Sequence, residues 1–196
     1  SGLNNLADVV RQQGRVADAV PLLEEAIAIR RQTVGDTHPS LALVVGHLGR
    51  VYSQQGDAAK AEPLLREALT IRQRVYGDDH PDTVNTRSDL TSLLHDQGDL
   101  AGAEPLYRAA VNSLATRLGR TSSDYAVQVN NLATVLEDQR RFEEAERLYR
   151  ESLAIRLHLN APVPQSVARA QHNLARTLLA VGRLPEAEEL VRTALA

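Results

Sequence analysis

The sequence predicts an all-α protein, a solenoid of stacked helix-turn-helix repeats. Three observations predict it: one spacing recurs along the whole chain, the apolar pattern inside each repeat has a helical period, and small residues recur where paired helices would meet. The chain has 196 residues, which is enough to bury a continuous core. It contains no cysteine, so disulfides, thiol catalysis and zinc-thiolate sites are excluded.

The repeat is 42 residues long and does not slip. Leucine follows this step at Leu6, Leu48, Leu90, Leu132 and Leu174. Alanine follows it at Ala19, Ala61, Ala103, Ala145 and Ala187, and glycine at Gly14, Gly56, Gly98 and Gly182, with Arg140 at the position that glycine skips. A fixed step of this size is typical of solenoids. We expect one array of four full repeats and a truncated fifth, at about 4–45, 46–87, 88–129, 130–171 and 172–196.

Each repeat consists of two predicted helices joined by a tight turn. In the second repeat Leu48, Val51 and Tyr52 follow helical spacing, the turn comes at Gly56, and the pattern then resumes. We expect the second helix of this repeat to run from about Ala59 to Tyr76 and to end at Gly77. Side-chain capping of the second helices is optional, because aspartate stands at the cap position in some repeats and arginine in others.

Three prolines bear on the shape of the second helices. Pro21, Pro63 and Pro105 fall inside the expected second helices, where proline removes a hydrogen bond. They predict either a mild kink or a helix that starts later than the pattern suggests.

Small residues recur where paired helices meet. Ala7, Gly49 and Ala133 stand where two helix backbones must approach. Because one helix pair cannot enclose its own apolar face, neighbouring units must stack.

The pattern resembles that of tetratricopeptide repeats. The shared motif is a leucine followed by alanine or glycine, with another alanine thirteen residues after the leucine; it begins at Leu6-Ala7, Leu48-Gly49, Leu132-Ala133 and Leu174-Ala175. The long second helix and the loops at 35–39 and 77–81 are similar to those of the kinesin-light-chain-like class. The resemblance implies a right-handed superhelix whose first helices line a concave groove, and a protein-binding role.

Placing the outward positions of the first helices by this resemblance gives a predominantly polar candidate groove. The candidate peptide-binding residues are Asn5, Asp8, Arg11, Gln12, His47, Arg50, Gln54, Asp89, Ser92, His95, Asp96, Asn131, Thr134, Glu137, Asp138, Asn173 and Arg176. Polar positions beside apolar ones indicate an exposed surface rather than a core. Asn5, Asn131 and Asn173 share one position in the repeat. Their amides either hold a peptide backbone or bond the neighbouring repeat, and the sequence leaves both interpretations open.

The charges of the candidate groove predict an acidic centre. Asp89, Asp96, Glu137 and Asp138 lie in its middle, between Arg11 and Arg50 at one end and Arg169 and Arg176 at the other. We expect such a groove to favour a partner that is basic in its middle and to bind it less tightly as salt rises. The acidic, aromatic-anchored cargo that the resemblance implies would be repelled, so that specificity is not carried over.

Catalysis, metals and cofactors find no support in the sequence. His47, Asp89 and His95 could be drawn as a metal cluster, but no HExxH spacing or fourth ligand accompanies them. His38 and His80 precede prolines in matched loops and are interpreted as turn residues. No phosphate-binding glycine loop and no GxSxG motif occurs. We expect a protein that is not an enzyme and holds no cofactor or metal.

The partner classes are narrowed by charge and hydropathy. Lys plus Arg is 22 against 25 for Asp plus Glu, a net charge of -3, which does not favour nucleic acid or a membrane surface. No apolar stretch approaches the length of a membrane span. We expect a cytoplasmic protein and, because its basic residues are almost all arginine, a bacterial source. The partner is then a protein or peptide.

Two functional hypotheses remain. The first is an interaction module that binds a peptide in its groove, as part of a larger adaptor or sensor protein of which this chain is a fragment. The second is a rigid spacer or self-associating element with an empty groove. Because Leu174, Leu178, Leu190 and Leu195 would leave apolar area uncovered, we also expect either end-to-end self-association or fraying of the last helix.

Overall fold

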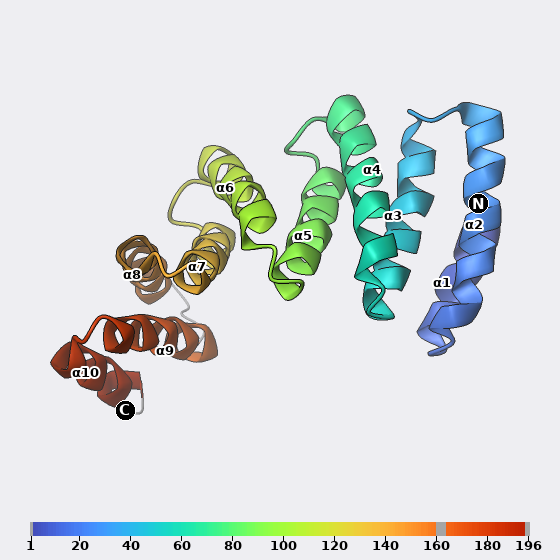
Figure 1. The fold of residues 1–196 in the computed structure, drawn as a ribbon. Coiled ribbons are helices and arrows are strands. Elements are labelled where there is room, and N and C mark those ends of the chain that lie inside the picture. The colour runs from blue at the N-terminus through green and yellow to red at the C-terminus, as the bar shows by residue number, and fades with distance from the viewer. Residues whose placement is uncertain (1, 160–163, 195–196) are drawn as a thin grey trace. The chain divides into compact units, whose positions relative to one another are not determined.

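A computed structural model describes residues 2–159 and 164–194 (Figure 1), and within these ranges the chain forms ten α-helices and no strand. The first unit of the fold, Ser1–Asp99, and the second, Leu100–Ala196, are each compact. The first unit contains α1 Gly2–Gln12, α2 Val16–Val34, α3 Pro39–Gln54, α4 Ala58–Tyr76 and α5 Pro81–Asp96. The second unit contains α6 Leu100–Arg117, α7 Ser123–Asp138, α8 Phe142–His158, α9 Pro164–Ala180 and α10 Leu184–Ala194.

The all-α prediction is confirmed, and so is the division of each repeat into a first and a second helix. Odd-numbered helices are the first helices of the repeats, and even-numbered helices are the second. The second helix expected from about Ala59 runs from Ala58 to Tyr76 and ends at Gly77. None of the helices in the described ranges is long and apolar enough to cross a bilayer.

The turn between the two helices of a repeat uses a left-handed backbone. Gly56 has a φ of 76°, and the other glycines of this series are similar. Arg140, which stands where the fourth repeat lacks glycine, takes the same conformation with a φ of 61° and is the sole residue other than glycine with positive φ in the described ranges. The turn geometry is therefore kept at a position where a side chain makes it unfavourable.

Helix caps differ between the two kinds of helix. The Asp57 side chain accepts a hydrogen bond from the backbone N–H of Lys60, whereas Arg15 makes no capping bond, which confirms that capping of second helices is optional. The first helices α3 and α5 are capped by histidine, a role that the sequence pattern, which indicates only a turn residue, does not predict. Nδ1 of His38 accepts from the N–H of Ser40, and Nδ1 of His80 accepts from that of Asp82.

The prolines lie inside the second helices, so the alternative of a later helix start is wrong. Each proline deprives a carbonyl four residues earlier of its helical donor. Those carbonyls belong to Ala17, Ala59 and Ala101, which are exposed and can bond water instead. The kink expected at these positions stays a prediction.

The core of the first unit joins successive repeats. Val44, Leu48 and Val51 of α3 are buried in one cluster with residues of α1 and α2, namely Ala7, Ala19, Leu23 and Ala26. Within the second repeat, α3 and α4 approach closely at Gly49, because a Cβ there would lie 2.9 Å from Cγ of Leu65. The small residue expected at this position is thus required by the packing.

The core of the second unit corrects the expectation of uncovered leucines near the end of the chain. Leu174 and Leu178 are buried in one cluster with Leu132, Leu136 and Tyr149 of α7 and α8. Leu190 is half-buried, and Leu195 lies outside the described residues. Burial against the preceding repeat covers α9 more fully than the sequence pattern alone suggested.

Candidate functional site

Polar side chains on the first helices of the first unit pair from one repeat to the next. Nδ1 of His47 on α3 lies 3.7 Å from a carboxylate oxygen of Asp8 on α1, and Nη1 of Arg50 donates to Asp89 on α5 at 3.1 Å. The two pairs are equivalent in the 42-residue repeat. Asp8 and Arg50 each lie two positions after a leucine of the series, and their partners His47 and Asp89 each lie one position before the next leucine. These four candidate groove residues are therefore also contacts between repeats.

Two recesses lie along these pairs. The smaller, of about 10 Å³, is lined by Asp8, Arg11, His47 and Arg50 together with buried apolar residues. The larger, of about 170 Å³, is lined by residues of α3, α4 and α5, namely Arg50, Ser53, Gln54, Leu65, Asp89 and Ser92. Arg50 lines both recesses. The larger one has donors and acceptors around walls that are mostly apolar in area.

His47 is the least satisfied polar group in the smaller recess. Its Nδ1 is buried and has no hydrogen-bond partner among the residues that the structure describes. Burial lowers the pKa of His47, the positive charge of Arg50 lowers it further, and Asp8 opposes both effects. The imidazole is therefore neutral at pH 7 and can act as a hydrogen-bonding group.

The remaining candidates in the first unit are spread along the same helices. Arg11 lies 3.8 Å from Asp8, and Asn5 and Gln12 are exposed on α1. His95 is half-buried near the end of α5, and Asp96 is exposed beside it. None of Asn5, Gln12, His95 and Asp96 lines either of the two recesses.

In the second unit the candidate Glu137 is buried, so its placement in an exposed groove is wrong. Only 8% of Glu137 is exposed. Its carboxylate accepts hydrogen bonds from Arg176 at 2.5 Å, from the Tyr149 hydroxyl at 3.0 Å and from the Thr177 hydroxyl at 3.1 Å. We call these four residues the Glu137 cluster. It joins α7 and α8 to α9.

The neighbouring candidates support this contact between repeats. Nδ2 of Asn173 donates to Oδ1 of Asn130 at 3.4 Å, which favours, for Asn173, the interpretation in which the amide orders the stack. The Thr134 hydroxyl donates to the backbone carbonyl of Asn130 and lies 3.0 Å from that of Tyr149. Asn131 is half-buried and Asp138 is exposed.

These contacts correct the expected acidic centre. Asp89 is paired with Arg50, and Glu137 is buried against Arg176. The arginines that the sequence placed at the ends of a charged surface thus neutralise two of the four carboxylates assigned to its middle. The residues that reasoning from the sequence missed are Tyr149 and Thr177. The available signal was the tyrosine itself, since a buried phenol needs a hydrogen-bond partner.

The histidines and acids of the candidate groove do not converge on a metal site. His47 faces Asp8, while Asp89 faces Arg50, so the drawn cluster of His47, Asp89 and His95 is not assembled. Within residues 2–159 and 164–194, no three side chains of His, Asp or Glu are placed to hold a metal ion.

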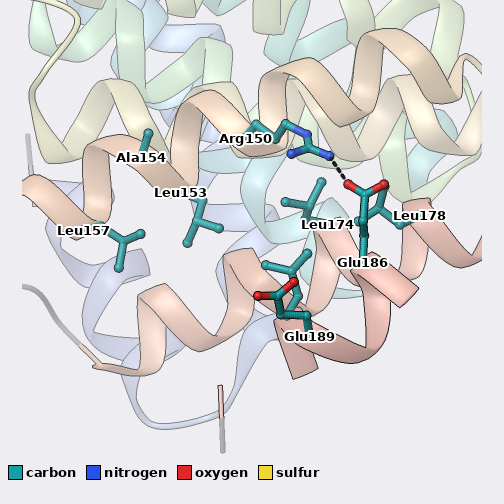
Figure 2. Close-up of a pocket in the computed structure, with 9 residues that line it drawn as sticks. Arg150, Leu153, Ala154, Leu157, Leu174, Leu178, Glu186 and Glu189 are labelled. Carbon is teal, nitrogen blue, oxygen red and sulfur yellow. Dashed lines mark hydrogen bonds and ion pairs between the residues drawn. The ribbon is translucent and has the colours of Figure 1, made fainter. Parts of the chain in front are cut away.

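A separate apolar hollow of about 460 Å³ lies in the second unit, on α8, α9 and α10 (Figure 2). Leu153 and Leu157 of α8 line it together with Leu174 and Leu178 of α9. Arg150 donates to Glu186 at 3.1 Å across its rim, as Figure 2 shows. In the first unit the position of Leu157 holds Arg31 in one repeat and Gln73 in the next. The leucine at this edge of the hollow is therefore not repeated there, and the sequence did not predict the hollow.

Comparison with known families identifies the repeat. The model of the family described as tetratricopeptide repeat matches residues 1–73, 45–115 and 125–196. A search of curated protein sequences found no significant match.

Solved structures show the same fold. A Podospora anserina protein described as a kinesin light chain with nearly identical TPR-like repeats is 29% identical, with a TM-score of 0.83 over 100% of this chain and 94% of its own. BtubC (BKLC) from P. vanneervenii is 24% identical, with a TM-score of 0.81 over 98% of this chain and 76% of its own. MamA from Desulfovibrio magneticus RS-1 is 13% identical, with a TM-score of 0.71 over 98% of this chain and 91% of its own. The kinesin-light-chain-like resemblance is confirmed.

Proposed function

Because the chain belongs to the tetratricopeptide repeat family, whose repeats generally mediate protein–protein interactions, we propose that its first-helix surface binds an extended segment of another protein. Scaffolds of this family are typically non-catalytic. The proposed site lies in the first unit, on α3 and α5. It is centred on the larger recess, which we call the α3–α5 recess.

The polar side chains around the α3–α5 recess, beside a mostly apolar surface, are the observation that carries this proposal. Gln54 and Ser92 are exposed there, and each can both donate and accept a hydrogen bond. Arg50 adds further donors and Asp89 further acceptors. An extended peptide presents one N–H and one C=O per residue, so alternating donors and acceptors on the protein match its backbone.

The charge of the α3–α5 recess predicts how selective this binding is. The Arg50–Asp89 pair is neutral as a unit, with 37% and 31% of the two side chains exposed. We therefore expect a peptide without a strong net charge to bind, and we expect its affinity to change little with salt. Specificity then comes from side chains that fit the recess rather than from long-range attraction.

Peptide display tests the proposal directly. A library of random peptides selected on the chain should enrich sequences that bind the α3–α5 recess. Ser92→Trp should abolish their binding, because the indole fills the recess. Glu25→Trp adds the same side chain to an exposed position of α2 and should leave binding unchanged.

The other results are equally informative. Enriched peptides that bind Ser92→Trp as tightly as the unmodified chain would contradict the proposed site. A selection that enriches no peptide would favour the spacer role instead.

A further inference from the structure

The α3–α5 recess has a counterpart two repeats later in the chain, where larger side chains stand at its positions. Three of its lining residues, Ser53, Leu65 and Ser92, correspond at twice the 42-residue step to Glu137, Tyr149 and Arg176. In the second unit these larger side chains bond one another in the Glu137 cluster. The recess therefore results from small side chains inside the array.

An ion pair at the recess keeps part of its bonding capacity unused. Nη1 of Arg50 donates to Oδ2 of Asp89 at 3.1 Å. In the part of the chain that the structure describes, Nε and Nη2 of Arg50 and Oδ1 of Asp89 have no hydrogen-bond partner. The pair therefore presents donors beside an acceptor to a ligand, and its net charge is zero.

A primary carboxamide matches such a pair. Its carbonyl oxygen accepts hydrogen bonds and its NH₂ group donates them, so one amide can bond Arg50 and Asp89 together. A carboxylate only accepts, and Asp89 would repel it. An ammonium group only donates, and Arg50 would repel it. The polar atoms of the pair thus favour an uncharged side chain with both functions.

The rest of the recess favours an aliphatic stem beneath the amide. Its walls are mostly apolar in area, and the fully buried Leu65 is among the residues that line it. The recess measures about 170 Å³. A cavity of about 150 Å³ holds a benzene molecule, so there is room for a side chain of the size of glutamine. Glutamine combines an apolar stem with a carboxamide at its end.

We propose that the α3–α5 recess binds a glutamine side chain of the partner segment, whose carbonyl accepts from Arg50 and whose NH₂ group donates to Asp89. This inference rests on the proposed function and names the residue that anchors the segment. Gln54 and Ser92, which are exposed beside the recess, are left to bond the backbone of the segment.

Peptides selected by display on the unmodified chain test this anchor. Those whose binding Ser92→Trp abolishes should share a glutamine at one position. Synthetic peptides with that glutamine replaced by glutamate or by methionine should bind about tenfold or more weakly. Glutamate introduces a charge, and methionine keeps the size of the side chain but loses its hydrogen bonds. Isothermal titration calorimetry measures these affinities.

Two variants of the chain should change the preferred anchor. Asp89→Asn leaves the charge of Arg50 unopposed, so the glutamate peptide should bind this variant more tightly than the glutamine peptide does. Arg50→Met leaves Asp89 unopposed, so a peptide with lysine at the anchor should bind best. Asp96→Asn, at an exposed position of α5 outside the recess, should keep the preference for glutamine. Far-ultraviolet circular dichroism checks that the variants fold.

The possible results separate the glutamine anchor from the proposed function. Peptides that Ser92→Trp excludes, but that share no glutamine or bind equally well with methionine in its place, would overturn the anchor and leave the proposed site standing. A preference for glutamine that survives both Asp89→Asn and Arg50→Met would overturn it in the same way. Peptides that are indifferent to Ser92→Trp, or a selection that enriches none, would overturn both proposals.

Discussion

The first helices of the two units use polar residues in different ways. In the first unit, Arg50 and Asp89 form a partly exposed pair across neighbouring helices. In the second unit, the Glu137 cluster buries a carboxylate between α7, α8 and α9. A polar residue that faces the neighbouring repeat thus becomes either a ligand-accessible group or part of the core, depending on what its neighbours place over it.

This difference teaches where binding can evolve on a repeat. A buried carboxylate with three donors stabilises the contact between repeats, because its removal breaks three hydrogen bonds there, although the Tyr149 hydroxyl keeps Thr134 and the Thr177 hydroxyl keeps the carbonyl of Asn173 as a partner. A half-exposed ion pair contributes little to stability and can exchange its partners for a ligand. We therefore place the proposed peptide site on the first unit, although the two units share one repeat pattern.

The largest expected effect comes from the Glu137 cluster. Glu137→Ala should lower the free energy of unfolding by about 3 kcal/mol, because it removes the buried acceptor of Tyr149, Thr177 and Arg176. Urea denaturation followed by circular dichroism measures this loss. Glu143→Ala, at an exposed position of α8, should stay within about 0.5 kcal/mol of the unmodified chain. Equal losses of stability for the two substitutions would show that the buried carboxylate contributes no more to stability than an exposed one.

The second effect concerns how closely paired helices approach. Gly49→Ala should destabilise the chain by about 1 kcal/mol net, since overpacking against Leu65 costs about 2 kcal/mol and helix propensity returns about 1 kcal/mol. Gly46→Ala is the matched control, because a Cβ there meets Ala68 at an ordinary 3.5 Å. It should stabilise α3 by up to about 1 kcal/mol. A stabilising Gly49→Ala would show that α4 can shift. The second unit has Ala133 at the position of Gly49 and already accommodates the methyl group.

The third effect is a pH dependence confined to the first unit. Burial and the nearby Arg50 lower the pKa of His47 from its ordinary 6.5, so the unfolded chain takes up a proton more readily than the folded one. Stability should therefore fall as pH drops below about 6.5. His47→Gln should remove part of this slope, as measured by thermal unfolding between pH 5 and 8.

The exposed His158 of α8 is the control for this measurement. His158→Gln should keep the slope of the unmodified chain. A slope that survives His47→Gln unchanged would assign the pH dependence to other groups.

The fold could be predicted from the sequence because its determinants repeat. The 42-residue step, the turn glycines and the helical spacing each recur, so that errors at one repeat are corrected by the others. The second helix of the second repeat was placed within one residue at its start. The histidine caps were missed, because a histidine before proline is compatible with both a turn and a helix start.

For the site, the sequence predicts which positions of each repeat lie on the same side of the first helices, but not which of these positions are buried. The position five residues after each leucine of the series holds Arg11, Ser53, His95, Glu137 and Leu179. The repeat pattern places all five on one side of the first helices. Their burial depends on residues of adjacent helices, such as Tyr149 and Arg176 around Glu137, and no single-repeat pattern contains that information. Which charged residues pair with each other likewise depends on residues of adjacent helices.

The smallest expected effect is the coupling between Arg50 and Asp89, and it tests the contrast most directly. A double-mutant cycle with Arg50→Gln and Asp89→Asn should give a coupling of about 0.5 kcal/mol, because about a third of each side chain is exposed and water screens the pair. The coupling should shrink further as salt rises. A coupling above about 2 kcal/mol would make this pair as structural as the Glu137 cluster. The α3–α5 recess would then be committed to stability, and a peptide could not recruit its charges.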